Sequence, residues 1–123
     1  MPNLQRLVEA VSLRVEDWPL IFVHNDVEGV SDRQLAGRLA GRLFNRLNGQ
    51  RPVTAVTADK VVGWSFSDVN YVAVVQLTAT GDPVKLRRTI ETWPNLTFVL
   101  VGGEDALQKY IGLLKEAITI VFD

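Results

Sequence analysis

Hydrophobic residues recur at helical spacing near the start of the chain and then form an uninterrupted run. The spacing predicts an amphipathic helix that Asn3 can cap and that Trp18-Pro19 should end, since a residue before proline is pushed out of helical geometry. The apolar stretch Leu20–Val23 follows and predicts a short strand buried on both sides. The apolar positions of the helix are Leu4, Leu7, Val8, Val11 and Val15.

A second helix is predicted from Ser31 onward. Ser31 with Gln34 forms a capping-box pattern, and Asn48-Gly49 supplies a carboxyl-terminal stop. The leucines of this segment are spaced by four residues, which places them on one broad apolar face beside two alanines and a phenylalanine. These residues are Leu35, Leu39, Leu43 and Leu47 with Ala36, Ala40 and Phe44.

Between residues 52 and 80 the periodicity changes from helical to alternating. Alternation of apolar and polar side chains is typical of half-buried strands. Polar interruptions at residues 58–60 and 67–70 divide the stretch, so it predicts either three antiparallel strands or one long kinked hairpin with its tip near Asp68. The alternating residues are Val53, Ala55 and Thr57, then Val62, Trp64 and Phe66, then Tyr71, Ala73, Val75, Leu77 and Ala79.

The last third of the chain predicts helix, strand, helix and strand. Asp82 can cap a helix that begins at Pro83 and ends near Thr92. An apolar strand over residues 96–101 then leads through Gly102-Gly103 into a final helix, and Thr119–Phe122 predicts an edge strand. The expected buried stripe of the final helix is Leu107, Tyr110, Ile111, Leu114 and Ile118.

This element order predicts one α+β domain over residues 1–123. Strand, helix, hairpin, helix and strand between Leu20 and Val101 match the split βαβ core of ferredoxin-like folds, whose sheet is mixed and mainly antiparallel, here with a helix added in front and a helix plus strand added behind. Helices are then expected on one face of the sheet only. Because Asp68 is the only charged residue in the stretch 61–80, the other face should be covered by a second layer or a subunit.

The amino-acid composition excludes several kinds of metal and cofactor site. The 123 residues carry a net charge of -1, and hydrophobic residues make up 47%. A chain with no cysteine and one histidine cannot build thiolate zinc sites, iron-sulfur clusters or sites that need two imidazoles. We therefore expect no cofactor, no membrane partner, no general nucleic-acid coat and a cytoplasmic location, or a virion if the protein is viral.

The end of the first strand carries a candidate metal site. His24, Asp26 and Glu28 alternate, so in extended geometry all three point to one side, and an imidazole with two carboxylates can bind a divalent metal. The other interpretation is a solvated exit loop, in which Asn25, Asp26 and Gly29 supply turn chemistry and His24 is a half-exposed strand end.

The same stretch resembles the Cas2 endoribonuclease family. Phe22–Asp26 followed by Arg33–Ala36 is similar to its strand that ends in aspartate, short loop and helix rich in arginine and leucine. The resemblance covers about fifteen residues and implies a ferredoxin-like fold in which Asp26 would bind metal. The family usually begins with that strand, whereas a complete helix precedes it here.

The second predicted helix carries candidate interface residues. Arg38, Arg42 and Arg46 form one stripe, which could bind a protein partner, follow phosphates, or only flank the apolar face with solvated charges. Gly37 and Gly41 weaken a helix by about 0.5–1 kcal/mol each relative to alanine, which predicts a compensating close approach to the sheet or to another subunit.

Aromatic residues supply the remaining candidates. Trp64 and Phe66 lie on the stretch with few charges and are expected either in the core or at an interface. Gly102-Gly103 is instead expected to be a tight turn, because Glu104 and Asp105 in the next helical turn would repel a phosphate.

These observations favour a non-enzymatic protein that assembles with itself and with other proteins. Its size and dependence on sheet contacts are similar to those of small viral connector and tail-terminator subunits, an analogy at the level of fold. The alternative is a metal-dependent nuclease or phosphodiesterase that uses Asp26. A regulatory domain that binds a small ligand is a third interpretation.

Overall fold

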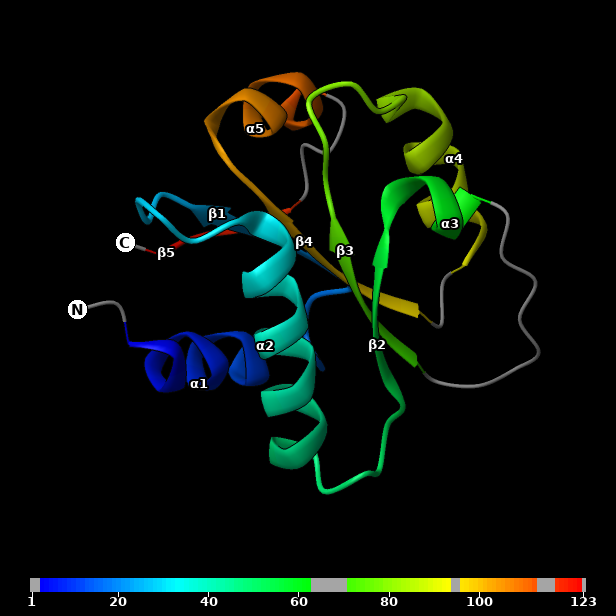
Figure 1. Ribbon diagram of the computed structural model, residues 1–123. Helices are drawn as coiled ribbons and strands as arrows, with labels where there is room; N and C mark the ends of the chain where they lie inside the picture. Colours follow the sequence, from blue (N-terminus) through cyan, green and yellow to red (C-terminus); the bar gives the residue numbers. More distant parts are fainter. Residues whose placement is uncertain (1–2, 63–70, 94–95, 113–116, 123) are drawn as a thin grey trace.

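The computed structural model shows a parallel α/β sheet with helices on both faces (Figure 1). It describes residues 3–62, 71–93, 96–112 and 117–122. The elements are α1 (Leu4–Arg14), β1 (Leu20–Asn25), α2 (Asp32–Arg46), β2 (Val53–Thr57), α3 (Ala58–Val62), β3 (Tyr71–Gln76), α4 (Pro83–Thr92), β4 (Leu96–Gly102), α5 (Glu104–Ile111) and β5 (Ile118–Phe122).

The sheet corrects the expected ferredoxin-like fold. Its five strands have the order β2-β3-β4-β1-β5, and every neighbouring pair is parallel. The prediction of antiparallel strands over residues 52–80 was wrong because α3 occupies residues 58–62 and lets the chain cross over between β2 and β3. The predicted alternation of buried and exposed side chains does not apply to β3. Val72–Val75 are buried on both faces of the sheet, as is typical of parallel sheets.

Helices cover both faces of the sheet, not one. The first core cluster joins α1 and α2 to side chains such as Val23, Val74 and Val99. The second joins α3, α4 and α5 to the alternate side chains, among them Phe22 and Phe98. Successive side chains of a strand point to opposite faces, so each central strand contributes to both cores. The sheet therefore needs no second subunit to cover a face.

Helix starts occur where the sequence predicts them. Asn3 accepts a hydrogen bond from the Arg6 amide at 3.3 Å. Both bonds of the capping box between Ser31 and Gln34 measure 3.1 Å. Asp82 accepts the amide of Val84 at 3.0 Å, with Pro83 in the first turn. These signals are local, so they do not depend on how the strands pair.

The end of the chain follows the prediction in part. β5 is an edge strand, as expected. Ile118, expected on the buried stripe of the last helix, belongs instead to β5. Leu114 lies outside the described residues. On α5 Tyr110 is fully buried, whereas the side chain of Ile111 is 48% exposed. The expected apolar stripe therefore belongs to two elements.

Candidate functional site at the carboxyl ends of β1 and β4

The topology marks one crevice of the sheet as a candidate site. From β1 the chain crosses through α2 to β2, and from β4 it crosses through α5 in the opposite direction to β5. Open parallel α/β sheets bind ligands outside the carboxyl ends of two such neighbouring strands. We call this place the switch-point crevice, formed by the segments after β1 and β4 and containing Asn25, Asp32 and Gly103.

The chain closes the switch-point crevice with its own hydrogen bonds. The buried Asn25 donates from Nδ2 to Asp32 Oδ1 at 3.0 Å and to the Val30 carbonyl at 2.9 Å. The other carboxylate oxygen, Asp32 Oδ2, accepts the Gly103 amide at 3.1 Å. One carboxylate therefore joins the first turn of α2 to the segment that follows β4.

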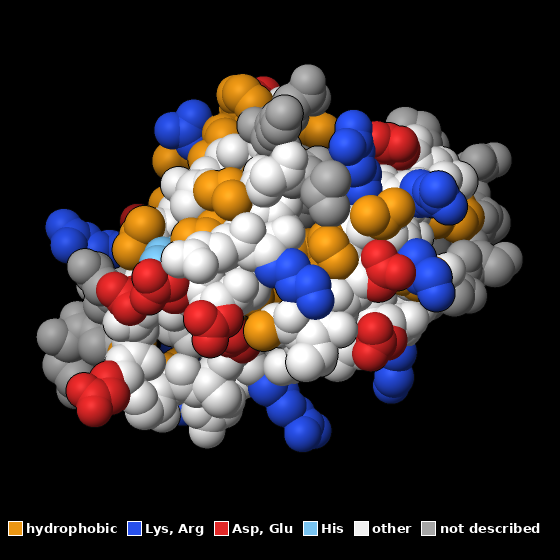
Figure 2. Space-filling model, turned by 90° about the horizontal axis from the view of Figure 1, so that it is seen from above, with side chains coloured by type: hydrophobic (Ala, Val, Ile, Leu, Met, Phe, Trp, Pro, Cys, Tyr) orange, Lys and Arg blue, Asp and Glu red, His pale blue; other side chains and the backbone are white. Residues whose placement is uncertain are grey.

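This arrangement disfavours an anionic ligand at the start of α2. A helix amino terminus attracts anions because its amides are unpaired and its dipole is positive there. Here Ser31 and Gln34 satisfy the capping position, and Asp32 places a carboxylate in the first turn. The preceding loop has a single glycine, Gly29, and no lysine, unlike a phosphate-binding loop. Figure 2, seen from the end at which α5 lies, shows acidic side chains (red) at the left near the histidine (pale blue) and others at the right among Lys and Arg side chains (blue).

Gly102 and Gly103 make the tight passage from β4 to α5 that the sequence predicts. A Cβ on Gly102 would lie 3.1 Å from Ala106 Cβ and 3.3 Å from Leu77 Cβ. Such contacts are closer than ordinary van der Waals packing. Gly102 therefore allows α5 and the segment after β3 to approach the end of β4.

The candidate metal ligands do not form a cluster. His24 lies on the same face of β1 as Phe22, and its buried Nε2 has no hydrogen-bond partner among the described residues. Asp26 and Glu28 are exposed in the following loop. No group of three His, Cys, Asp or Glu side chains in the described part of the chain could hold a metal ion. The extended alternation on which that prediction depended ends with β1 at Asn25.

Sequence reasoning missed Asn25 and Asp32 as a pair. Asn25 was expected in the exit loop after the first strand, and no role was predicted for Asp32. A polar residue at the carboxyl end of a buried strand and an acid just after a helix cap were the available signals. Their pairing depends on the parallel neighbours β1 and β4, which the predicted antiparallel hairpin did not contain.

Tyr110 forms a second crowded contact near the carboxyl ends of the strands. The Tyr110 side chain is fully buried, and its hydroxyl has no hydrogen-bond partner within the described segments. A Cβ added at Gly81 would overlap this hydroxyl. Burial raises the pKa of Tyr110, and the negative charges of Asp59 and Asp82 raise it further.

The outer face of α2, which carries its arginines and glycines, is exposed to solvent. Arg38, Arg42 and Arg46 are exposed, and a Cβ on Gly37 or Gly41 would meet no atom within 4 Å. The glycines therefore do not approach the chain's own sheet, because they lie on the face of the helix opposite its leucines. Their contact with another subunit stays a prediction, as does the role of the arginines.

Arg51 lies between α2 and β2, and its guanidinium binds the sheet. Its Nη2 donates to the Tyr71 carbonyl at 3.2 Å and to Thr97 Oγ1 at 2.9 Å. Thr97 in turn donates to the Val15 carbonyl at 3.3 Å. Burial lowers the pKa of Arg51, and the charge of Glu16 opposes that shift. Arg51 thus ties two strands to the end of α1.

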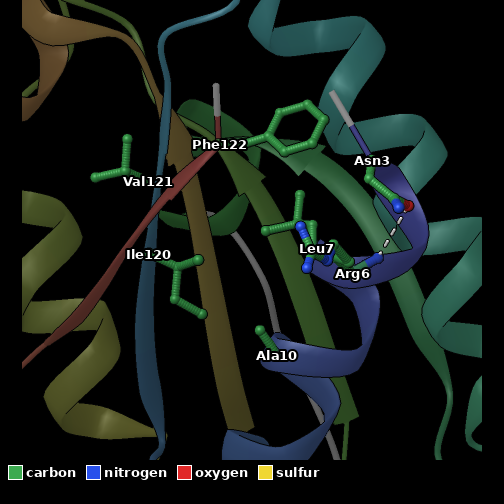
Figure 3. Close-up of a pocket in the computed structure, with 7 residues that line it drawn as sticks. All are labelled: Asn3, Arg6, Leu7, Ala10, Ile120, Val121 and Phe122. Carbon is green, nitrogen blue, oxygen red and sulfur yellow. Dashed lines mark hydrogen bonds between the residues drawn. The ribbon is translucent and has the colours of Figure 1, made fainter. Parts of the chain in front are cut away.

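Two grooves flank α1. The groove against α2 has a volume of about 350 Å³ and includes Glu9, Arg42 and Arg46. The groove against β5 has a volume of about 370 Å³ and includes Arg6 and Ile120 (Figure 3). Neither contains a cluster of catalytic groups.

Trp64 and Phe66 lie outside the described residues, so their placement in core or interface stays a prediction. No described helix has the length and hydrophobicity needed to span a bilayer. Neither the protein-family models nor the curated proteins contain a match to this chain.

Proposed function

We propose that this chain is a non-enzymatic module that assembles with copies of itself. The observation that carries the proposal is the closed switch-point crevice. There the chain's own Asp32 carboxylate accepts the Gly103 amide and the Asn25 side-chain amide. A small ligand would have to displace hydrogen bonds that are already made, and the replacement of a satisfied buried network costs free energy.

Exposed apolar side chains favour a protein partner over a small molecule. Leu13 is 74% exposed and Val121 is 56% exposed. Single exposed apolar residues are common, but Leu13 lies on α1 and Val121 on β5, the two elements that form the groove beside β5. Apolar side chains at a sheet edge lose more water on binding a protein than on binding a small ligand.

The viral analogy is not part of the proposal. It depended on contacts made by a hairpin, and residues 53–76 instead contain two parallel strands joined across α3. The alternative nuclease depended on a cluster around Asp26. With Asp26 and Glu28 exposed in a loop, that cluster has no geometric support.

Native mass spectrometry and light scattering at about 1–100 µM test the proposal. We expect an oligomer whose mass does not change with nucleotide, Mg²⁺ or Mn²⁺, and a melting temperature that these additives do not raise. Asp26→Ala should leave the oligomer and the melting temperature unchanged. A protein that stays monomeric over this range, or a cleavage activity that Asp26→Ala abolishes, would overturn the proposal.

A further inference from the structure

We infer that the outer edge of β5 pairs with the same edge of a second copy of the chain. The two strands would run antiparallel about a twofold axis at Ile120 and join two five-stranded sheets into one. This inference rests on the proposed assembly function and names its partner and its contact surface.

The backbone of β5 presents unpaired groups on its outer side. The Phe122 carbonyl accepts the Asp26 amide at 3.0 Å, so it faces β1. In a parallel ladder the bonded residues alternate, and the amides and carbonyls of Thr119 and Val121 therefore face away from β1. No strand of the described segments pairs with this side.

β5 lacks the features that normally protect a sheet edge. Edge strands are commonly protected by charged residues, proline or a bulge. Residues 118–122 are Ile-Thr-Ile-Val-Phe, with no charge and no proline. The side chains of Thr119 and Val121 point to the face of the sheet on which α5 packs. They are exposed, so α5 does not cover them at this edge. The strand thus offers both hydrogen-bonding groups and apolar surface.

A twofold axis at Ile120 pairs the strand with itself in a consistent register. Thr119 of one copy then lies opposite Val121 of the other, and vice versa. Both residues direct their backbone groups outward, so the two pairs would form about four hydrogen bonds. Ile120 faces Ile120 of the second copy as a close pair without backbone bonds between them. A homotypic contact repels itself when it contains a charged residue at its centre, and this strand contains none.

The charge on α1 also fits a twofold arrangement. Figure 3 shows Asn3 and Arg6 near the Phe122 end of β5 and Ala10 near Ile120, so α1 runs opposite to β5. Leu13 lies one turn beyond Ala10 on the same side of the helix. The axis then keeps the two copies of Arg6 at opposite ends of the contact. Arg6 of each copy then lies near the end of the other copy's α1 that carries Leu13. The exposed Leu13 side chain becomes partly covered by the contact.

Substitution of Val121 tests the contact. Val121→Lys would place two lysines in the paired strands, so we expect the dimer dissociation constant to rise about 30-fold or more by analytical ultracentrifugation. Val84→Lys is the matched control, since Val84 is 47% exposed but lies on α4. Thr119→Pro removes an outward amide without touching a bond to β1, and it should weaken the dimer as well.

A disulfide tests the register independently of stability. The chain has no cysteine, so Ile120→Cys introduces a single thiol. Residues opposite each other in a close antiparallel pair have Cα atoms about 4.5 Å apart, which suits a disulfide. We expect mild oxidation to cross-link Ile120→Cys but not Val84→Cys. An oligomer that persists in Val121→Lys and Thr119→Pro, with no cross-link in Ile120→Cys, overturns the β5 contact while the assembly function stands. If the strand that pairs with β5 comes from a different protein, the wild-type chain stays monomeric in solution. That result would overturn both the β5 contact and the assembly function.

Discussion

Two pairs of glycines in this molecule have opposite surroundings. At the carboxyl ends of the strands, a Cβ added at Gly81 would overlap the Tyr110 hydroxyl, and one added at Gly102 would crowd Ala106 and Leu77. On the outer face of α2, Gly37 and Gly41 have open space around the position of a Cβ. The comparison shows that a glycine inside a helix does not by itself indicate close packing, whereas a glycine after a buried strand does here.

The largest expected effect is at Gly81. Gly81→Ala forces the new methyl against the Tyr110 hydroxyl, and overpacking of this kind costs about 1–3 kcal/mol of unfolding free energy. Urea denaturation measures the loss. The matched control Gly112→Ala has no atom within 4 Å of its Cβ and should change stability little. Tyr110→Phe removes the obstructing oxygen, so it should rescue much of the Gly81→Ala loss. Equal losses with and without the hydroxyl would contradict the contact.

Asp32 should show the next largest effect. Asp32→Ala removes the acceptor of the Gly103 amide and one of the two acceptors of Asn25 Nδ2, and an unsatisfied buried donor costs about 1–3 kcal/mol. The same denaturation experiment measures it, and hydrogen exchange at the Gly103 amide should accelerate. Glu28→Ala changes an exposed acid nearby and should have an effect within about 0.5 kcal/mol. If the two variants lose stability equally, the bridge does not stabilise the crevice.

Alkaline pH should weaken the crowded region selectively. The raised pKa of Tyr110 means that the unfolded chain loses this proton first as pH rises. Stability from the neutral phenol is therefore complete below about pH 10 and falls as pH rises from there through the folded-state pKa. Denaturation midpoints at pH 8 to 11 check this decline, with Tyr110→Phe as the control. The decline attributable to Tyr110 should be absent in Tyr110→Phe, and an identical decline in both proteins would exclude this tyrosine as its source.

The smallest effect has the opposite sign. Gly37→Ala and Gly41→Ala should each raise the unfolding free energy by about 0.5–1 kcal/mol, because alanine favours the helix and meets no neighbour. Thermal melting measures the gain, and light scattering follows the oligomer. Assembly through β5 predicts an unchanged oligomer in both variants. Loss of the oligomer would instead place the small-residue face of α2 in the interface.

The sequence by itself determined the local elements. Helix caps at Asn3, Ser31 and Asp82 depend on side chains within three residues of the amides they bind, so they could be predicted without any knowledge of the fold. The apolar runs that became β1 and β4 and the edge position of β5 were also predictable.

Only the tertiary structure decided the direction of the strands and the candidate site. A strand such as β3 pairs in either direction with the same residues, and burial on both faces removes the alternation that distinguishes a half-exposed strand. The bridge between Asp32 and Gly103 spans 71 positions and exists because β1 and β4 are parallel neighbours. Contacts between residues so far apart in the sequence depend on the order of the strands in the sheet. The local periodicity of apolar residues does not indicate that order.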